Sequence, residues 1–374
     1  MNIAMRRPML NLSLLSLGMG AVLIAQFFSA LADNAVLIAA IAIAKNNGMP
    51  RLVPLLQESF VLPFILLAPF SGPIADGFPK GHVMLGANLV KLSGATAMAM
   101  GANPLLAYGL IGIGATIYSP AKYGILSQMF GPDRLVRANG LLEGSTIAAI
   151  LLGVLLGGWL ADHSLTWAFG GVVACYAIAT AANMLIPRLP AENADANFHP
   201  GHLVRRFWDA LRSLFSDSSA RFSLFGTSIF WGSGTTLRLV LFAWVPVALL
   251  LNDNETPAKL MGVVSVLILI MAFVANMSTA VLVMAAVGFC GGLFVVPLNA
   301  LLQERGHDSV GAGSALAVQN FSENLVMLLF VGAYSLVSAA GAPVAQTVIG
   351  FGTVLVLAVV AISAMRLHRR SSFS

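Results

Sequence analysis

The chain has 374 residues, of which 58% are hydrophobic and 9% are charged, and its mean hydropathy is +0.87. Soluble domains carry about 25% charged residues, so this composition excludes an ordinary soluble fold and indicates a membrane protein. The formal net charge of +5 is then a signal of topology rather than of an acidic soluble partner.

Six apolar segments in the first half are long enough to span a bilayer, which takes about 20 residues as a helix. They lie near residues 14–43, 52–75, 82–101, 103–129, 134–161 and 164–188. The first continues past Asp33 without a small-residue cleavage site, so we predict a retained helix rather than a signal peptide. In the fourth, Pro120 favours a local break that would aim Lys122 inward.

A polar stretch follows, from about Pro190 to Ala220. Its apolar residues recur at helical spacing, at Leu203, Val204, Phe207, Trp208, Leu211, Leu214 and Phe215, and it also carries Arg205, Arg206, Arg212 and Arg221. This pattern predicts an amphipathic helix at the cytoplasmic membrane interface. A solvated linker with some helicity is the alternative.

Five further apolar segments lie near 221–251, 258–276, 277–303, 309–339 and 342–367, which makes eleven in all. We therefore predict an all-α polytopic membrane protein with a six-helix bundle over 1–188, a linker with an amphipathic helix over 189–220, and a C-terminal bundle over 221–374.

Basic residues set the expected orientation. With the N-terminus in the cytoplasm, the inside loops hold Lys80, Arg134, Arg137 and Arg188, the outside keeps Lys45 and Arg51, and the tail with Arg366, Arg369 and Arg370 also belongs inside. Both termini are thus predicted to be cytoplasmic.

The two halves carry a parallel internal repeat. Its members are Pro120, Val136, Ala138, Asn139, Gly140 and Leu142 in the first half and Pro297, Val310, Ala312, Gly313, Ser314 and Leu316 in the second. Two parallel six-helix halves are the architecture of major facilitator transporters, whose substrate site lies between the halves. The spacing also predicts that the second half lacks about one helix and its turn between Pro257 and Gln303, where twelve helices are expected in all. Either a segment there is re-entrant or the chain is a shortened form.

Seven ionisable residues interrupt the apolar segments: Asp33, Glu58, Lys91, Lys122, Glu143, Arg238 and Glu323. A charge in the bilayer centre costs about 2.5–3.5 kcal/mol on the mildest scales, so these residues indicate a polar interior.

Two helices carry polar stripes of opposite charge. One is formed by Gln26, Ser29 and Asp33, and the other by Thr227, Trp231, Thr235 and Arg238. If the first helices of both halves meet at a central cavity, Asp33 and Arg238 pair in one state and separate in another. A fixed structural salt bridge is the alternative.

Two further polar clusters are candidates for binding or gating. The first contains Asn139, Glu143 and Thr146, and the second contains Asn320, Glu323 and Asn324. Glu143 and Glu323 are expected to contact a cationic headgroup or to carry protons. Hydrogen bonds that only hold helices together are the alternative. Lys91 is either structural or faces an anion.

The turn from Gly72 through Asp76 to Lys80 and Gly81 resembles the signature loop of the major facilitator superfamily, in which the aspartate caps a neighbouring helix and holds one conformation. We therefore expect Gly72, Asp76 and Lys80 to form a conformational loop. The chain has one lysine where that loop usually carries several basic residues.

Longer strings carry a closer resemblance. They are AQFFSALADNA (25–35), YSPAKYGIL (118–126), ANGLLEGSTIAAILLG (138–153), FSLFGTSIFWGSGTTLR (222–238), FVVPLNALLQERG (294–306) and VGAGSALAVQNFSEN (310–324). They resemble the bacterial lysophospholipid transporter (LplT) family, which has an additional helix and turn between about Lys259 and Met277. Asp33 and Arg238 match charged motif residues of that family.

The resemblance implies inward flipping of lysophospholipids, chiefly lysophosphatidylethanolamine, across the bacterial inner membrane. It also implies a functional partner, an acyl-acyl-carrier-protein synthetase and acyltransferase that restores the second chain. We expect a monomer with no cofactor, metal or nucleic acid. In this interpretation Arg238 or Lys122 attracts the phosphate and Asp33 or Glu143 the ammonium.

Two rival functions remain. A generic facilitator for drugs or small solutes has the same fold. A membrane-embedded enzyme is disfavoured because the six histidines lie in loops or at helix ends, without metal-binding spacing.

Overall fold

The structure is a computed structural model that describes residues 16–49, 52–193, 198–217, 220–221, 223–228, 231–232, 302, 309–310, 312–340, 346, 349–350, 353–354 and 357. Every regular element within these ranges is a helix. The chain divides into two compact units. One comprises 1–221 with 299–321, and the other comprises 222–298 with 322–374.

The first unit contains helices at all six segments predicted for the first half. They are α1 (Leu17–Asn46), α2 (Leu52–Leu66) with α3 (Ala68–Gly77), α4 (Lys80–Ala99), α5 (Pro104–Met129), α6 (Pro132–His163) and α7 (Leu165–Met184). The predicted segments of the first half are confirmed, with ends that differ by a few residues. Contrary to the expected break at Pro120, α5 is one continuous helix through that residue.

Local sequence explains several of these boundaries. The Ser16 hydroxyl accepts a hydrogen bond from the Met19 amide at 3.3 Å, and the Asn103 side chain accepts from the Leu105 amide at 2.9 Å. Both side chains satisfy donors that have no partner within the helix. Pro104 follows Asn103 directly, where its missing amide proton costs nothing.

The second expected span is broken. Helices α2 and α3 meet at Leu67 with a bend of 63°. Pro63, Pro69 and Pro73 surround the bend. Pro63 and Pro73 lie inside α2 and α3, where each removes a backbone donor from the helical ladder, and Pro69 lies in the first turn of α3, where proline is tolerated. The sequence predicted one helix near 52–75, and the proline cluster is the physical reason for the difference.

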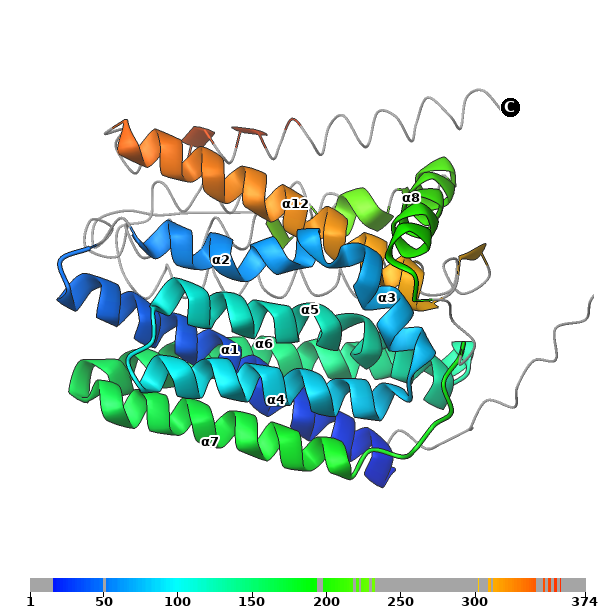
Figure 1. Cartoon of the computed structure of the whole chain (residues 1–374), viewed down its shortest axis with the longest axis horizontal. Helices are drawn as coiled ribbons and strands as arrows, with labels where there is room; N and C mark the ends of the chain where they lie inside the picture. Colours follow the sequence, from blue (N-terminus) through cyan, green and yellow to red (C-terminus); the bar gives the residue numbers. More distant parts are fainter. Residues whose placement is uncertain are drawn as a thin grey trace, which may run out of the picture. The chain divides into compact units, whose positions relative to one another are not determined.

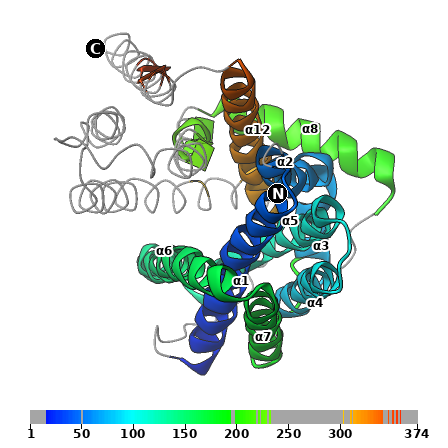
Figure 2. The ribbon, with the colours of Figure 1, turned by 90° about the vertical axis from the view of Figure 1, so that its left-hand side faces the viewer.

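Helix α1 lies in the middle of the bundle, as the end-on view shows (Figure 2). It packs along α6 and α7, while α4 packs along α5 and α7, and α2 covers α5 (Figure 1). Residues of α1 therefore face the interior on several sides. A charge on one of these inward faces is surrounded by protein rather than by lipid.

Two glycines allow α6 to approach α1 closely. A Cβ atom on Gly153 would lie 2.5 Å from the Leu31 carbonyl oxygen, and one on Gly157 would lie 2.8 Å from the Ala35 Cα. Backbones packed this closely gain van der Waals contact that lipid tails cannot replace. The side of α1 opposite its charged partners is fixed by this contact.

The linker contains the predicted amphipathic helix, α8 (Pro200–Ser216). Leu203, Phe207, Ala210 and Leu214 are buried, whereas Val204 and Trp208 are exposed. Helix α8 packs against α3 (Figure 1), and the Phe207 ring meets the Phe321 ring edge to face. The helix is confirmed; its position in a membrane interface stays a prediction.

Of the second half, the structure describes mainly α12 (Ala312–Ala339), which matches the segment expected near 309–339. The expected segment near 258–276, the one near 277–303 apart from Leu302, and most of the stretch with the missing helix lie outside the described residues. In the described ranges, five helices are long and apolar enough to cross a membrane, or six if α2 and α3 form one span.

Candidate functional site

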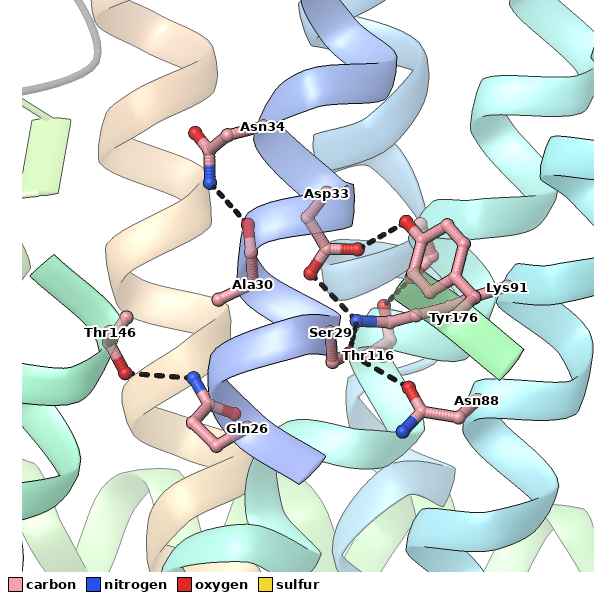
Figure 3. A network of polar contacts seen from close by, with 11 residues as sticks. Gln26, Ser29, Ala30, Asp33, Asn34, Asn88, Lys91, Thr116, Thr146 and Tyr176 are labelled. Atoms are coloured by element: carbon pink, nitrogen blue, oxygen red, sulfur yellow. Dashed lines mark hydrogen bonds and ion pairs between the residues drawn. The ribbon is translucent and has the colours of Figure 1, made fainter. Parts of the chain in front are cut away.

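Asp33 lies near the middle of α1, and both of its carboxylate oxygens have a partner from another helix (Figure 3). The Lys91 ammonium on α4 donates to Oδ2 at 2.7 Å, and the Tyr176 hydroxyl on α7 donates to Oδ1 at 2.6 Å. Hydrogen bonds to a charged group are shorter and stronger than neutral ones. The carboxylate therefore has a defined orientation and a compensating charge inside the bundle.

The Lys91 ammonium is buried among polar and aromatic groups. It also donates to the Ser29 hydroxyl at 3.0 Å, and that hydroxyl donates to the Asn88 side-chain oxygen at 2.8 Å (Figure 3). The ammonium lies 5.1 Å from the centre of the Tyr118 ring, a distance typical of a cation–π contact. The Lys91 side chain is 2% exposed, whereas the Asp33 side chain is 19% exposed. Asp33 is thus the member of the pair that a ligand could reach.

The polar stripe of α1 divides between two neighbours. Ser29 and Asp33 face α4 and α7, while the Gln26 amide donates to the Thr146 hydroxyl on α6 at 2.8 Å (Figure 3). The sequence predicted one continuous face. The two directions follow from the central position of α1, which has helices on both sides.

A second polar group joins α5 and α6. The Tyr123 hydroxyl donates to the Glu143 carboxylate, and the Lys122 ammonium lies 4.6 Å from the centre of the Tyr123 ring. Glu143 and Lys122 are both buried. Two predicted site residues, one of each charge, therefore meet around a single tyrosine that was not among the predicted residues.

The remaining predicted residues are more dispersed. The Asn139 amide donates to the Leu135 carbonyl of its own helix at 3.0 Å. Asn320 on α12 accepts from the Ser119 hydroxyl at 3.0 Å. Glu323 is also buried on α12, and Trp231 is partly buried. Arg238 lies outside the described residues, so its pairing with Asp33 stays a prediction.

The predicted conformational loop contains a cluster of three charges. The Lys80 ammonium donates to Asp76 at 2.9 Å, to Glu192 in the linker at 2.7 Å and to the Ala75 carbonyl at 3.0 Å. Lys80 is fully buried, and Gly72 is buried nearby on α3. The Asn193 amide also donates to the Asp76 carbonyl at 2.8 Å. This cluster fastens the linker to the turn between α3 and α4.

Sequence reasoning missed the partners more often than the charges. Tyr176, Tyr123 and Glu192 complete the groups around Asp33, Glu143 and Lys80. Each tyrosine stands in an apolar helix, where its hydroxyl needs a buried partner. That requirement was the available signal. Among the described residues, no group of three or more His, Cys, Asp or Glu side chains could hold a metal ion.

The comparisons with known proteins agree with this architecture. The family model of the Major Facilitator Superfamily matches residues 22–281. The lysophospholipid transporter LplT of Yersinia pestis (strain Pestoides F) is 49% identical over 362 residues, covering 88% of this chain and 89% of the relative. The LplT protein of Yersinia pseudotuberculosis (serotype O:3, strain YPIII) gives the same identity and coverage.

Solved structures share the fold at low sequence identity. The human organic anion transporter MFSD10 is 14% identical with a TM-score of 0.65, covering 92% of this chain and 99% of that one. A POT family transporter is 10% identical with a TM-score of 0.66, covering 94% and 96%. These likenesses concern the fold alone.

The alignment with the Yersinia pestis relative has more positions than there are residues of this chain in it. It runs over 362 residues but includes 88% of 374, about 329, so about 30 positions hold a residue only in the relative. One helix and its turn have about this length; the place of the gap stays a prediction. The matched family model and the two Yersinia relatives place this chain in the major facilitator superfamily and, within it, in the LplT family.

Proposed function

We propose that this chain is a secondary transporter that moves lysophospholipids, chiefly lysophosphatidylethanolamine, from the outer to the inner leaflet of the bacterial inner membrane. The observation that carries the proposal is the 49% identity to proteins named lysophospholipid transporters over most of both chains. In the cytoplasm, an acyl-acyl-carrier-protein synthetase and acyltransferase then restores the second acyl chain. The transporter acts as a monomer with both termini in the cytoplasm.

The chemistry of the substrate explains why such a path needs interior charges. A lysophospholipid has a charged headgroup that resists transfer into hydrocarbon and one acyl chain that does not. The Asp33 carboxylate, partly exposed on a buried helix, supports the assignment of this residue to the headgroup ammonium. Glu143 is the second carboxylate assigned to the path, and Arg238 or Lys122 binds the phosphate.

The remaining predicted residues line the same path in this proposal. They are Gln26, Asn139, Trp231, Asn320 and Glu323, with Gly72, Asp76 and Lys80 in the conformational loop. Rocking of the two halves then exposes the headgroup to alternate sides of the membrane, as in other transporters with parallel repeats. The acyl chain remains beside apolar surface during the movement.

The test is expression of this chain in cells that lack their own lysophospholipid transporter. Labelled lysophosphatidylethanolamine is supplied outside, and its conversion to the diacyl lipid is measured against the amount of protein in the membrane. We expect conversion by the wild type and a large but measurable loss in Asp33→Asn, because the amide cannot replace the charge. Asp162→Asn is the matched control, since Asp162 is exposed at the end of α6.

Either of two outcomes contradicts the proposal. No conversion by a membrane-inserted wild type refutes lysophospholipid transport and directs attention to drug or small-solute transport. Equal conversion by the wild type and Asp33→Asn refutes only the role of Asp33 and leaves lysophospholipid transport standing.

A further inference from the structure

Asp33 and Lys91 form a pair that carries no net charge inside the N-terminal bundle. Lys91 donates to one carboxylate oxygen at 2.7 Å and Tyr176 to the other at 2.6 Å, so the carboxylate is held from two directions. The ammonium is held in turn by the Ser29 hydroxyl at 3.0 Å and by the ring faces of Tyr118 and Tyr176. A rotation of Asp33 away from this geometry would break both of its bonds.

The stem of Lys91 has a dedicated slot between α4 and α5. Gly114 of α5 faces it, and a Cβ atom at this position would lie 2.7 Å from Lys91 Cγ and 2.6 Å from the Ala87 carbonyl oxygen. Such distances are too short for real side chains, so the slot exists only because residue 114 is glycine. The Lys91 side chain is therefore held at its stem as well as at its ammonium.

We propose that Lys91 is a positioning residue that acts through Asp33. It orients the carboxylate toward the headgroup and compensates its charge while no substrate is bound. This inference rests on the function proposed above. When the headgroup ammonium arrives, it exchanges with Lys91 for the same carboxylate, so an unpaired carboxylate is never left in the interior.

The first test is a double-mutant cycle on transport. Conversion of lysophosphatidylethanolamine is measured per membrane-inserted molecule for the wild type, Lys91→Met, Asp33→Asn and the double variant. In the wild-type background, we expect Lys91→Met to lower conversion about 10- to 100-fold, which is the loss typical of an orienting partner. In the Asp33→Asn background, we expect Lys91→Met to cause no further loss. Lys91→Arg, which keeps the charge, should recover part of the activity.

A merely structural ion pair predicts other results. The double variant, in which both charges are absent, would then regain stability and transport together. Independent losses that multiply in the double variant would show that Lys91 does not act through Asp33. Either result overturns the proposal.

The second test displaces Lys91 without removing a charge. Gly114→Ala pushes on the lysine stem, while Gly94→Ala is a matched control on the same pair of helices. At Gly94 the three atoms nearest to an added Cβ would be Ile111 Cγ1 at 2.8 Å, the Ala107 carbonyl oxygen at 2.9 Å and the Ile111 amide nitrogen at 3.2 Å, and none of them belongs to Lys91. We expect Gly114→Ala to lose about tenfold or more in conversion per molecule and Gly94→Ala to retain it. Equal losses would contradict the proposal.

The thermal unfolding midpoints of the four cycle variants in detergent separate this inference from the proposed function. If the wild type converts no lysophospholipid, the proposed function fails, and the midpoints alone judge the coupling. Lys91→Met should then lower the midpoint in the wild-type background but not in the Asp33→Asn background. Additive shifts would overturn the coupling of Lys91 to Asp33.

Discussion

Lys80 and Lys91 are two buried lysines of one bundle, and each pairs with an aspartate. Both stems run past a glycine of α5, Gly124 for Lys80 and Gly114 for Lys91. Their surroundings differ, because Lys80 has two carboxylates and a carbonyl as acceptors, whereas Lys91 has one carboxylate, a hydroxyl and aromatic rings. The Lys80 cluster joins a turn to the linker, and the Lys91 pair joins helices in the membrane interior. The same kind of ion pair thus holds the linker against a turn in one place and, in our proposal, orients a carboxylate for the substrate in the other.

The largest expected effect on stability is that of Lys80→Met. Removing this buried ammonium leaves Asp76 and Glu192 close together without a counter-charge. Breaking a buried ion pair costs about 3–5 kcal/mol. We expect a large fall in the thermal midpoint of the protein in detergent, with Lys45→Met, at an exposed position, as the control. A thermal midpoint within experimental error of that of the wild type would show that the Lys80 cluster does not stabilise the fold.

Tyr176→Phe tests the Lys91 side of the comparison with a smaller change. The variant removes one hydrogen bond to the Asp33 carboxylate and keeps the ring beside Lys91. A hydrogen bond to a charged group contributes about 1.5–3 kcal/mol. We expect a moderate loss of stability and a loss of lysophospholipid conversion per molecule. Loss of stability with full conversion would assign Tyr176 to structure alone.

Glu192→Gln weakens the Lys80 cluster at its most accessible member. The Glu192 side chain is 26% exposed, so its charge is screened, and we expect a loss of about 1 kcal/mol or less. The effect should be local: limited proteolysis should cut the linker between α7 and α8 faster, while the thermal midpoint changes little. A cutting rate equal to that of the wild type would mean that Glu192 does not restrain the linker.

The smallest effect is expected for Arg212→Gln on α8. Arg212 and Asp209 are both exposed, and their closest charged atoms are 3.9 Å apart. Exposed pairs contribute about 0–1 kcal/mol, and many contribute nothing measurable. The thermal midpoint should stay within error, which sets the lower end of the scale for the buried pairs. A clear fall would show that α8 depends on this pair.

The helices were more predictable from the sequence than their partners. Long apolar segments located α1, α5, α6 and α7 because a span must satisfy its backbone within itself. The bend at Leu67 was missed, although Pro63, Pro69 and Pro73 mark it. Three prolines within eleven residues interrupt the ladder more strongly than a single one, and Pro120 alone leaves α5 continuous.

The site was predictable as a set of charges and much less as a set of contacts. Spacing along α1 identified Asp33, Ser29 and Gln26, since helical periodicity is a local property. Lys91 and Tyr176 stand on other helices, so their contacts depend on how the bundle packs. Sequence patterns cannot supply that information without a second, related chain. Large polar side chains in apolar helices nevertheless identified the residues that form the buried polar contacts.

The order of residues around Asp33 has a consequence for biosynthesis. Its partners Lys91 and Tyr176 follow it by 58 and 143 positions in the chain, so α1 is synthesised long before α4 and α7. A lone carboxylate at the bilayer centre costs about 2.5–3.5 kcal/mol on insertion scales. This cost is not offset by Lys91 until α4 has been made. The second hydrogen bond to the carboxylate, from Tyr176, becomes available only when α7 has been made.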